Sequence, residues 1–163
     1  VKLNVVAVWT AENYGMNFNG YAKGAASYVI PEGWTVEVTY INPSPIPHSL
    51  IVVEKGDLKK LQVQQPAFKG AAVPDHLKGL AYGKATFTFV ADEAGEYALA
   101  CGFPSHALNG HWIGLEISAA REISHHHHSG ASGDPPLLVA TVTPHRPKGV
   151  RWQGEQGRRG CSD

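Results

Sequence analysis

The feature that most constrains the fold of this chain is a series of short bursts in which apolar and polar residues alternate. The clearest bursts cover residues 35–40, 86–89, 97–99 and 113–118. Successive side chains of an extended strand point to opposite faces, so this alternation predicts strands with one buried face. Residues 50–53 form a continuous apolar run, which is typical of a strand buried on both faces, and residues 3–9 and 27–30 are further strand candidates.

The segments between these bursts are rich in glycine, proline and asparagine. Turn residues at 31–33 and 92–95 predict tight connections, and residues 42–47 contain three prolines, which a central strand does not tolerate. We expect a few helical turns around residues 57–61 of the long connection 54–83. About seven or eight short strands with this spacing predict an all-β Greek-key sandwich in a domain of residues 1–120. We expect four aromatic residues in its core: Trp9, Trp34, Tyr28 and Phe87.

The last part of the chain, residues 121–163, does not continue the strand pattern. It contains a histidine run at 125–128 and then scattered proline, arginine and glycine, and only residues 137–142 have the composition of a strand. A natural metal-binding histidine tract is one interpretation. We favour the other, an expression tag followed by vector-derived sequence. In both cases we expect a flexible or disordered tail, because its apolar content is too low to offset the entropy cost of ordering.

The composition excludes some classes of function. The 14 Lys and Arg residues balance the 14 Asp and Glu residues, so we expect no binding to nucleic acid, which normally requires a basic face. No apolar run reaches the roughly 18 to 20 residues that span a bilayer, so we expect no transmembrane segment in this chain. Of the two cysteines, Cys161 lies in the polar tail, and we do not expect it to form a disulfide with Cys101.

One segment carries several side chains that can bind a metal ion. It reads Cys-Gly-Phe-Pro-Ser-His-Ala-Leu-Asn-Gly-His from Cys101 to His111 and connects two predicted strands. Thiolate is a soft ligand and imidazole an intermediate one, a combination that suits copper in both oxidation states. His48 is the natural second imidazole, because it follows a proline-stiffened loop at the start of a buried strand. Each residue taken singly is an ordinary core or loop residue, but their joint spacing predicts a metal site that includes His48, Cys101 and His106.

The stretches around these residues resemble the blue copper proteins, most closely the sulfocyanin family and more distantly rusticyanin. The matching stretches are residues 17–21, 30–36, 42–50 and 101–106, with Gly110. The resemblance implies a cupredoxin fold and one type 1 copper ion bound by His48, Cys101 and His106. It also implies that Ser49 hydrogen-bonds backbone near the cysteine, and we expect Asn42 to brace the loop before His48. Ordinary turn capping is the alternative role for both side chains.

The chain departs from the family pattern at His111, where that pattern places methionine as a weak axial ligand. His111 either binds copper as a fourth and stronger ligand, or points away from the metal, or is a change introduced in the laboratory. We favour coordination by His111. Because imidazole donates more strongly than thioether, we then expect stabilised Cu(II), a lower reduction potential and a blue absorption shifted toward green or red.

We expect the protein to transfer single electrons as its copper cycles between Cu(II) and Cu(I), and not to be an enzyme. One alternative is a small copper redox enzyme or sensor whose open axial position binds a small ligand such as nitric oxide. Another is a metal-free binding sandwich. We expect a monomer whose redox partner proteins dock near Phe103, Pro104 and His106. The family resemblance implies an extracytoplasmic location, periplasmic or at the cell surface, with a membrane tether in the full-length protein.

Overall fold

The computed structural model describes residues 1–119 and 141–142, and over these residues the fold is built from β-strands. In chain order the strands are β1 (Lys2–Val6), β2 (Ser27–Pro31), β3 (Thr35–Asn42), β4 (Ile51–Glu54), β5 (Gly83–Val90), β6 (Gly95–Ala100), β7 (Trp112–Ser118) and β8 (Thr141–Val142). The helical segments of the described chain are two short 3-10 turns, η1 (Glu12–Gly15) and η2 (Lys55–Lys59). The all-β prediction is confirmed, and η2 places the expected helical turns slightly earlier than residues 57–61.

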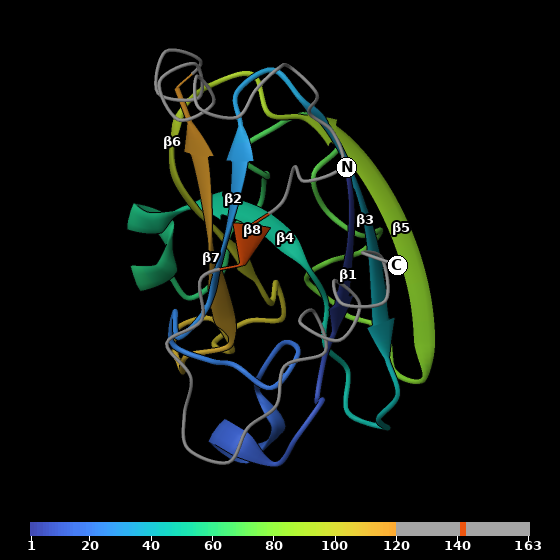
Figure 1. Ribbon diagram of the computed structural model, residues 1–163. Helices are drawn as coiled ribbons and strands as arrows, with labels where there is room; N and C mark the ends of the chain where they lie inside the picture. The colour runs from blue at the N-terminus through green and yellow to red at the C-terminus, as the bar shows by residue number, and fades with distance from the viewer. Residues whose placement is uncertain (120–140, 143–163) are drawn as a thin grey trace, which may run out of the picture.

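The strands form two sheets that face each other (Figure 1). One sheet has the order β1-β3-β5, and the other has the order β4-β6-β7-β2-β8. Strand β1 pairs parallel with β3, and β2 pairs parallel with β7. Strand β3 pairs antiparallel with β5, and β6 pairs antiparallel with both β4 and β7. Except for β6 and β7, the neighbouring strands are not consecutive in sequence, and segments distant in sequence therefore meet at the ends of the sheets.

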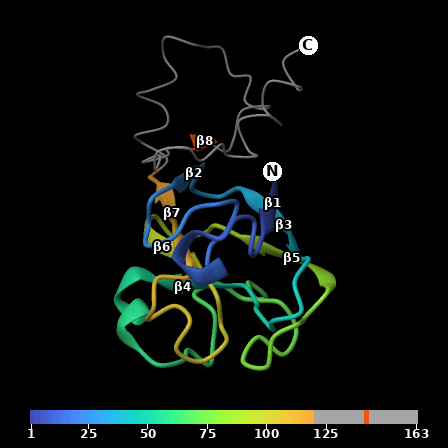
Figure 2. The same ribbon diagram turned by 90° about the horizontal axis from the view of Figure 1, so that it is seen from below.

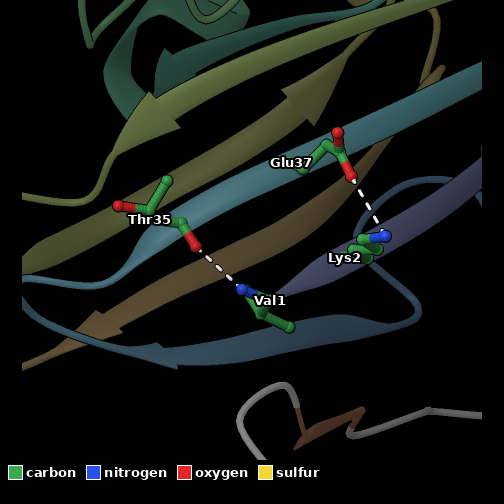
Figure 3. A network of polar contacts seen from close by, with 4 residues as sticks. All are labelled: Val1, Lys2, Thr35 and Glu37. Carbon is green, nitrogen blue, oxygen red and sulfur yellow. Dashed lines mark hydrogen bonds and ion pairs between the residues drawn. The ribbon is translucent and has the colours of Figure 1, made fainter.

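The parallel pair β1–β3 is anchored where the chain begins (Figure 3). The amino group of Val1 donates a hydrogen bond of 2.8 Å to the carbonyl oxygen of Thr35. Next to it, Lys2 Nζ lies 3.7 Å from Glu37 Oε1 on the solvent-facing side of the sheet. Because both side chains are exposed, this ion pair contributes little to stability, and the backbone register carries the pairing.

The hydrophobic core lies between the sheets and uses the alternating positions of the strands. Val36, Val38 and Tyr40 of β3 are fully buried. Tyr28 and Phe87 are buried, as predicted, and Trp34 is partly buried against the same core. The prediction for Trp9 is wrong, because this side chain is 39% exposed. Strand β1 ends at Val6, and the left-handed backbone of Val8 (φ 55°) then directs the chain out of the sheet before residue 9.

The predicted tail, residues 121–163, lies outside the described residues except for β8. This short strand pairs antiparallel with β2, with Val142 opposite Tyr28, and it falls within the stretch 137–142 that has strand composition. The domain boundary near residue 120 and the nature of the tail stay predictions. Within the described ranges 1–119 and 141–142, no helix has the length and apolar character needed to cross a membrane.

Loops gather at one end of the sandwich, the lower end in Figure 1. Seen from that end, the segment with η1, the loop that follows β6 and the connection between β4 and β5 lie side by side (Figure 2). Hydrogen bonds join them, since Asn13 Nδ2 donates to the carbonyl oxygen of Asn109 and the Ser105 N–H donates to that of Leu61. This end of the molecule holds all the predicted site residues.

Candidate metal centre

His48 lies on the proline-rich loop between β3 and β4. Asn42, buried at the end of β3, donates hydrogen bonds of 2.8 and 2.7 Å to the carbonyl oxygens of Ile46 and Leu80. The carbonyl oxygen of His48 in turn accepts the Leu80 N–H at 2.9 Å. The expected role of Asn42 is confirmed, and the bracing leaves the His48 side chain only 3% exposed.

Cys101 follows the last residue of β6, and His106 and His111 lie on the loop that leads into β7. Backbone hydrogen bonds close this loop on itself. The Cys101 N–H donates to the carbonyl oxygen of His111, and the His111 N–H donates to that of His106, both at 3.0 Å. Hydrogen bonds within the loop therefore fix the backbone positions of all three residues without the help of a metal ion.

The four side chains converge on one point. Cys101 Sγ lies 3.4 Å from His106 Nδ1 and 3.9 Å from His48 Nδ1, and the two Nδ1 atoms are 3.2 Å apart. One ligand atom from each of His48, Cys101, His106 and His111 lies within 4.8 Å of the others. The structure thus brings together all four predicted site residues, from segments more than fifty positions apart.

Ser49 connects the two segments that supply these residues. Its backbone N–H donates to Cys101 Sγ at 3.3 Å, and its hydroxyl accepts the Gly102 N–H at 2.8 Å and donates to the carbonyl oxygen of His76 at 2.6 Å. The expected contact of Ser49 with backbone near the cysteine is confirmed. Gly102 is required here, because a Cβ atom at this position would lie 2.9 Å from the Ser49 hydroxyl.

His111 is fully buried. Among the described residues, one of its two ring nitrogens has a hydrogen-bond partner and the other has none. Its Nε2 lies 3.2 Å from the carbonyl oxygen of Asn17, so Nε2 carries the proton and donates it. Its Nδ1 has no hydrogen-bond partner among the described residues. A buried acceptor without a partner is costly, and a metal ion in the cluster would satisfy this lone pair.

Burial also sets the protonation states of the cluster. It lowers the pKa of His48 to about 4, with a smaller contribution from the neighbouring His106. It lowers the pKa values of His106 and His111 as well. All three imidazoles are therefore uncharged near neutral pH, and each has a ring nitrogen whose lone pair can bind a metal ion. Burial raises the pKa of the Cys101 thiol to about 11, so a metal ion must displace the thiol proton to bind sulfur.

The donor set fits copper. Three neutral imidazoles and one thiolate are intermediate and soft ligands. No carboxylate belongs to this cluster, so hard oxygen-seeking cations such as Mg²⁺ and Ca²⁺ do not match it. His106 is half-buried, whereas His48, Cys101 and His111 are buried, so the cluster reaches solvent mainly through His106.

Sequence reasoning missed two neighbours of the cluster. The Phe18 ring packs against the His111 imidazole with ring centroids 4.1 Å apart, and the Asn17 carbonyl accepts the His111 proton. Both residues belong to a stretch that carries the family resemblance, but nothing in that stretch indicates a partner 94 positions away.

Comparisons with known proteins identify one similar sequence and several similar folds. Sulfocyanin of Sulfolobus acidocaldarius is 30% identical over 129 residues, which cover 72% of this chain and 63% of that protein. The chain thus spans less than two thirds of its curated relative. A copper nitrite reductase from Nitrosomonas europaea is 23% identical with a TM-score of 0.51, over 73% of this chain and 41% of that one. Reduced rusticyanin is 20% identical with a TM-score of 0.48, over 72% of this chain and 76% of that one.

The nitrite reductase similarity shows the fold alone, which is that of the cupredoxins. Cupredoxin homologues bind one copper ion, the metal that suits the donor set found here. The family model described as the sulfocyanin (SoxE) domain matches residues 1–126 and covers all four candidate ligands. The chain belongs to the sulfocyanin family of blue copper proteins.

Proposed function

We propose that this protein is a one-electron carrier whose single copper ion is held by His48, Cys101 and His106, with His111 as a fourth ligand. One observation carries the proposal: one thiol and three neutral imidazoles from two distant segments lie within 4.8 Å of one another. Copper bound there supplies a centre that accepts and releases one electron. The rest of the function falls to the protein, which must hold the ligands in place in both oxidation states.

The contacts around the cluster support this carrier role. His48 is braced through Asn42 and Leu80, and Cys101 through Ser49. Side chains locked by packing and hydrogen bonds move little when the charge of the metal changes, so little reorganisation accompanies electron transfer. A site built in this way favours exchange of electrons over turnover of a substrate.

Coordination by His111 is supported by its uncommitted Nδ1 and by its burial. A ring that donates Nε2–H to a carbonyl has its lone pair on Nδ1, and His48 packs edge-on against this ring with centroids 4.8 Å apart. A fourth ligand in this place, the third imidazole of the cluster, leaves less room for an exogenous ligand. The alternative function as an enzyme or sensor with an open axial position is therefore disfavoured.

We also propose that electrons enter and leave through His106. It is the half-buried member of the cluster, and the Phe103 ring stacks on it with centroids 4.6 Å apart. Phe103 and Pro104 are partly exposed, and Leu108 on the same loop is 50% exposed. These apolar side chains around His106 suit brief docking of a redox partner to a monomeric carrier.

The test is copper titration of the unaltered protein together with Cys101→Ser and His48→Ala variants. We expect an intense visible thiolate-to-copper absorption that rises with the first equivalent of copper and is lost in both variants. His76→Gln is the matched control, because His76 is a partly exposed histidine near the site but outside the cluster, and it should retain the absorption. Absence of this absorption in the unaltered protein would refute the copper site.

An extracytoplasmic location remains part of the proposal and rests on the family resemblance. A type 1 site requires Cys101 as an unoxidised thiolate. An extracytoplasmic location is compatible with this requirement, because Cys101 forms no disulfide within the described part of the chain. Fractionation of cells that express the full-length protein, with immunodetection, tests the location. Recovery with the cytoplasmic fraction would contradict it.

A further inference from the structure

Asn17 is the most thoroughly bonded side chain of the segment that packs against the loop from Cys101 to His111. Its Oδ1 accepts the backbone N–H groups of Trp9 and Thr10 at 3.1 and 3.3 Å. Its Nδ2 donates to the carbonyl oxygens of Thr10 and Glu12 at 3.0 and 2.7 Å. The side chain is fully buried and ties a nine-residue loop into one unit.

The backbone carbonyl of the same residue faces the cluster. It accepts two hydrogen bonds, from the Val8 N–H at 3.0 Å and from His111 Nε2 at 3.2 Å. The next residue, Phe18, packs its ring on the His111 imidazole. Asn17 and Phe18 thus hold His111 at one ring nitrogen and on one ring face.

The fixed carbonyl decides the tautomer of His111. A carbonyl oxygen only accepts, so the ring must place its proton on Nε2, which leaves the lone pair on Nδ1. With the opposite tautomer, Nε2 and the carbonyl oxygen would present two lone pairs to each other in a buried site. The contact therefore fixes which ring nitrogen is available to the cluster.

We propose that Asn17 is a positioning residue for the metal site, which acts by holding its own carbonyl where it fixes the tautomer and orientation of His111. The inference rests on the proposed function in so far as His111 is a copper ligand. Outer hydrogen-bond partners of a ligating histidine typically change metal affinity by about 10- to 100-fold when they are removed. Here the hydrogen-bond acceptor is a backbone atom, and the Asn17 side chain keeps that atom in place.

The test compares Asn17→Ala with a matched deletion at Asn19. Asn19 is also a buried asparagine, and its side chain bonds backbone groups of Val6 and Asn4. We choose Asn19→Gly because residue 19 has a positive φ of 53°, which glycine adopts without strain. Both variants lose stability, but only Asn17→Ala should lower Cu(II) affinity, by about 10- to 100-fold, and move the thiolate absorption toward that of His111→Met.

The same two deletions are then made in the His111→Met background. There we expect Asn17→Ala to affect copper affinity and absorption no more than Asn19→Gly does. Equal effects of the two deletions in the unaltered background, or an unchanged Asn17→Ala effect in the His111→Met background, would overturn the inference. If the unaltered protein with one equivalent of copper shows no thiolate absorption, the proposed function fails instead.

A second measurement covers the case in which Asn17→Ala does not fold. Nitrogen-15 NMR of the unaltered protein, metal-free and loaded with Cu(I), reports the protonated ring nitrogen of each histidine. The expected result is a His111 ring protonated at Nε2 in both states. A ring protonated at Nδ1 in the metal-free protein would overturn the inference whatever the variants do.

Discussion

Ser49 links the segment that supplies His48 to the loop that begins at Cys101. Its backbone N–H reaches the Cys101 sulfur, and its hydroxyl bridges the Gly102 N–H and the His76 carbonyl. The side chain is fully buried. Loss of the hydroxyl therefore leaves the Gly102 N–H without an acceptor directly beside the sulfur.

Ser49→Ala should lower the free energy of unfolding by about 1–3 kcal/mol, the usual cost of a buried unsatisfied group. It should also weaken copper binding and shift the thiolate absorption, because the backbone beside Cys101 relaxes. Ser44→Ala is a matched control: Ser44 is also buried, but its hydroxyl bonds Asn42 rather than the cysteine loop. Chemical denaturation and copper spectra distinguish the two, and identical spectral changes would contradict the role of Ser49.

His111→Met should restore the axial residue of the family pattern. Because thioether donates more weakly than imidazole, the expected result is a bluer protein with a higher reduction potential and one copper still bound at the cluster. Visible spectra and voltammetry measure both changes. An unaltered spectrum and potential would show that His111 does not bind the metal.

At the scale of elements, the turn that ends at Gly79 packs closely against the backbone of His48. Gly79 has φ +79°, and a Cβ atom there would lie 3.1 Å from both the nitrogen and the carbonyl oxygen of His48. The neighbouring Leu80 pairs with His48 as an isolated bridge. The long connection between β4 and β5 therefore contributes directly to the position of the first histidine.

Gly79→Ala should both strain this turn and displace His48, whereas Gly33→Ala should only strain its own turn. Gly33 has φ +93° and nothing within 4 Å of the added Cβ. Each change costs about 1–2 kcal/mol for the left-handed backbone. Only Gly79→Ala should also weaken copper affinity, measured by competition with a chelator of known affinity. Equal copper affinities in the two variants would contradict the contact.

Strands were predictable from sequence because their signal is local. Alternation in β3 and β5 follows from one buried face, and the structure confirms it. The same prediction is wrong for β7, which lies between β6 and β2 and is buried on both faces, with only Glu116 exposed. The exposure of Trp9 was not predictable, since it depends on a left-handed turn at Val8, and a β-branched valine gives no sign of one. The position of Asn17 against His111 was not predictable either, because it arises from the packing of two loops.

At the scale of the molecule, we predict that the site needs only the domain of residues 1–120. All four candidate ligands lie within residues 1–119. The domain boundary stays a prediction, which rests on the ligand spacing and the strand pattern, both of which end before residue 120. The family match extends only to residue 126.

A chain ending at residue 120 should therefore fold, bind one copper and keep the absorption of the full chain. The full chain should bind additional copper through the histidines at 125–128, without additional thiolate absorption. Metal analysis beside spectroscopy checks both statements. A truncated chain that folds but loses its absorption would contradict the domain boundary.

The buried imidazoles also couple the stability of the whole metal-free protein to pH. Burial and His106 lower the pKa of His48 to about 4, whereas a histidine in the unfolded chain titrates near 6.5. The pKa values of His106 and His111 are lowered too. Between these values the unfolded chain binds more protons than the folded one, so the free energy of unfolding falls as the pH falls.

The Tm of the metal-free protein should accordingly be highest above about pH 6.5 and fall steadily toward pH 4. His111→Met removes one buried imidazole and should make this dependence shallower. Copper binds only the folded cluster and must displace protons to do so, so the increase in Tm on copper loading should itself shrink toward acid pH. A metal-free Tm that stays constant or rises on acidification would show that the cluster is not held as neutral imidazoles in the folded state.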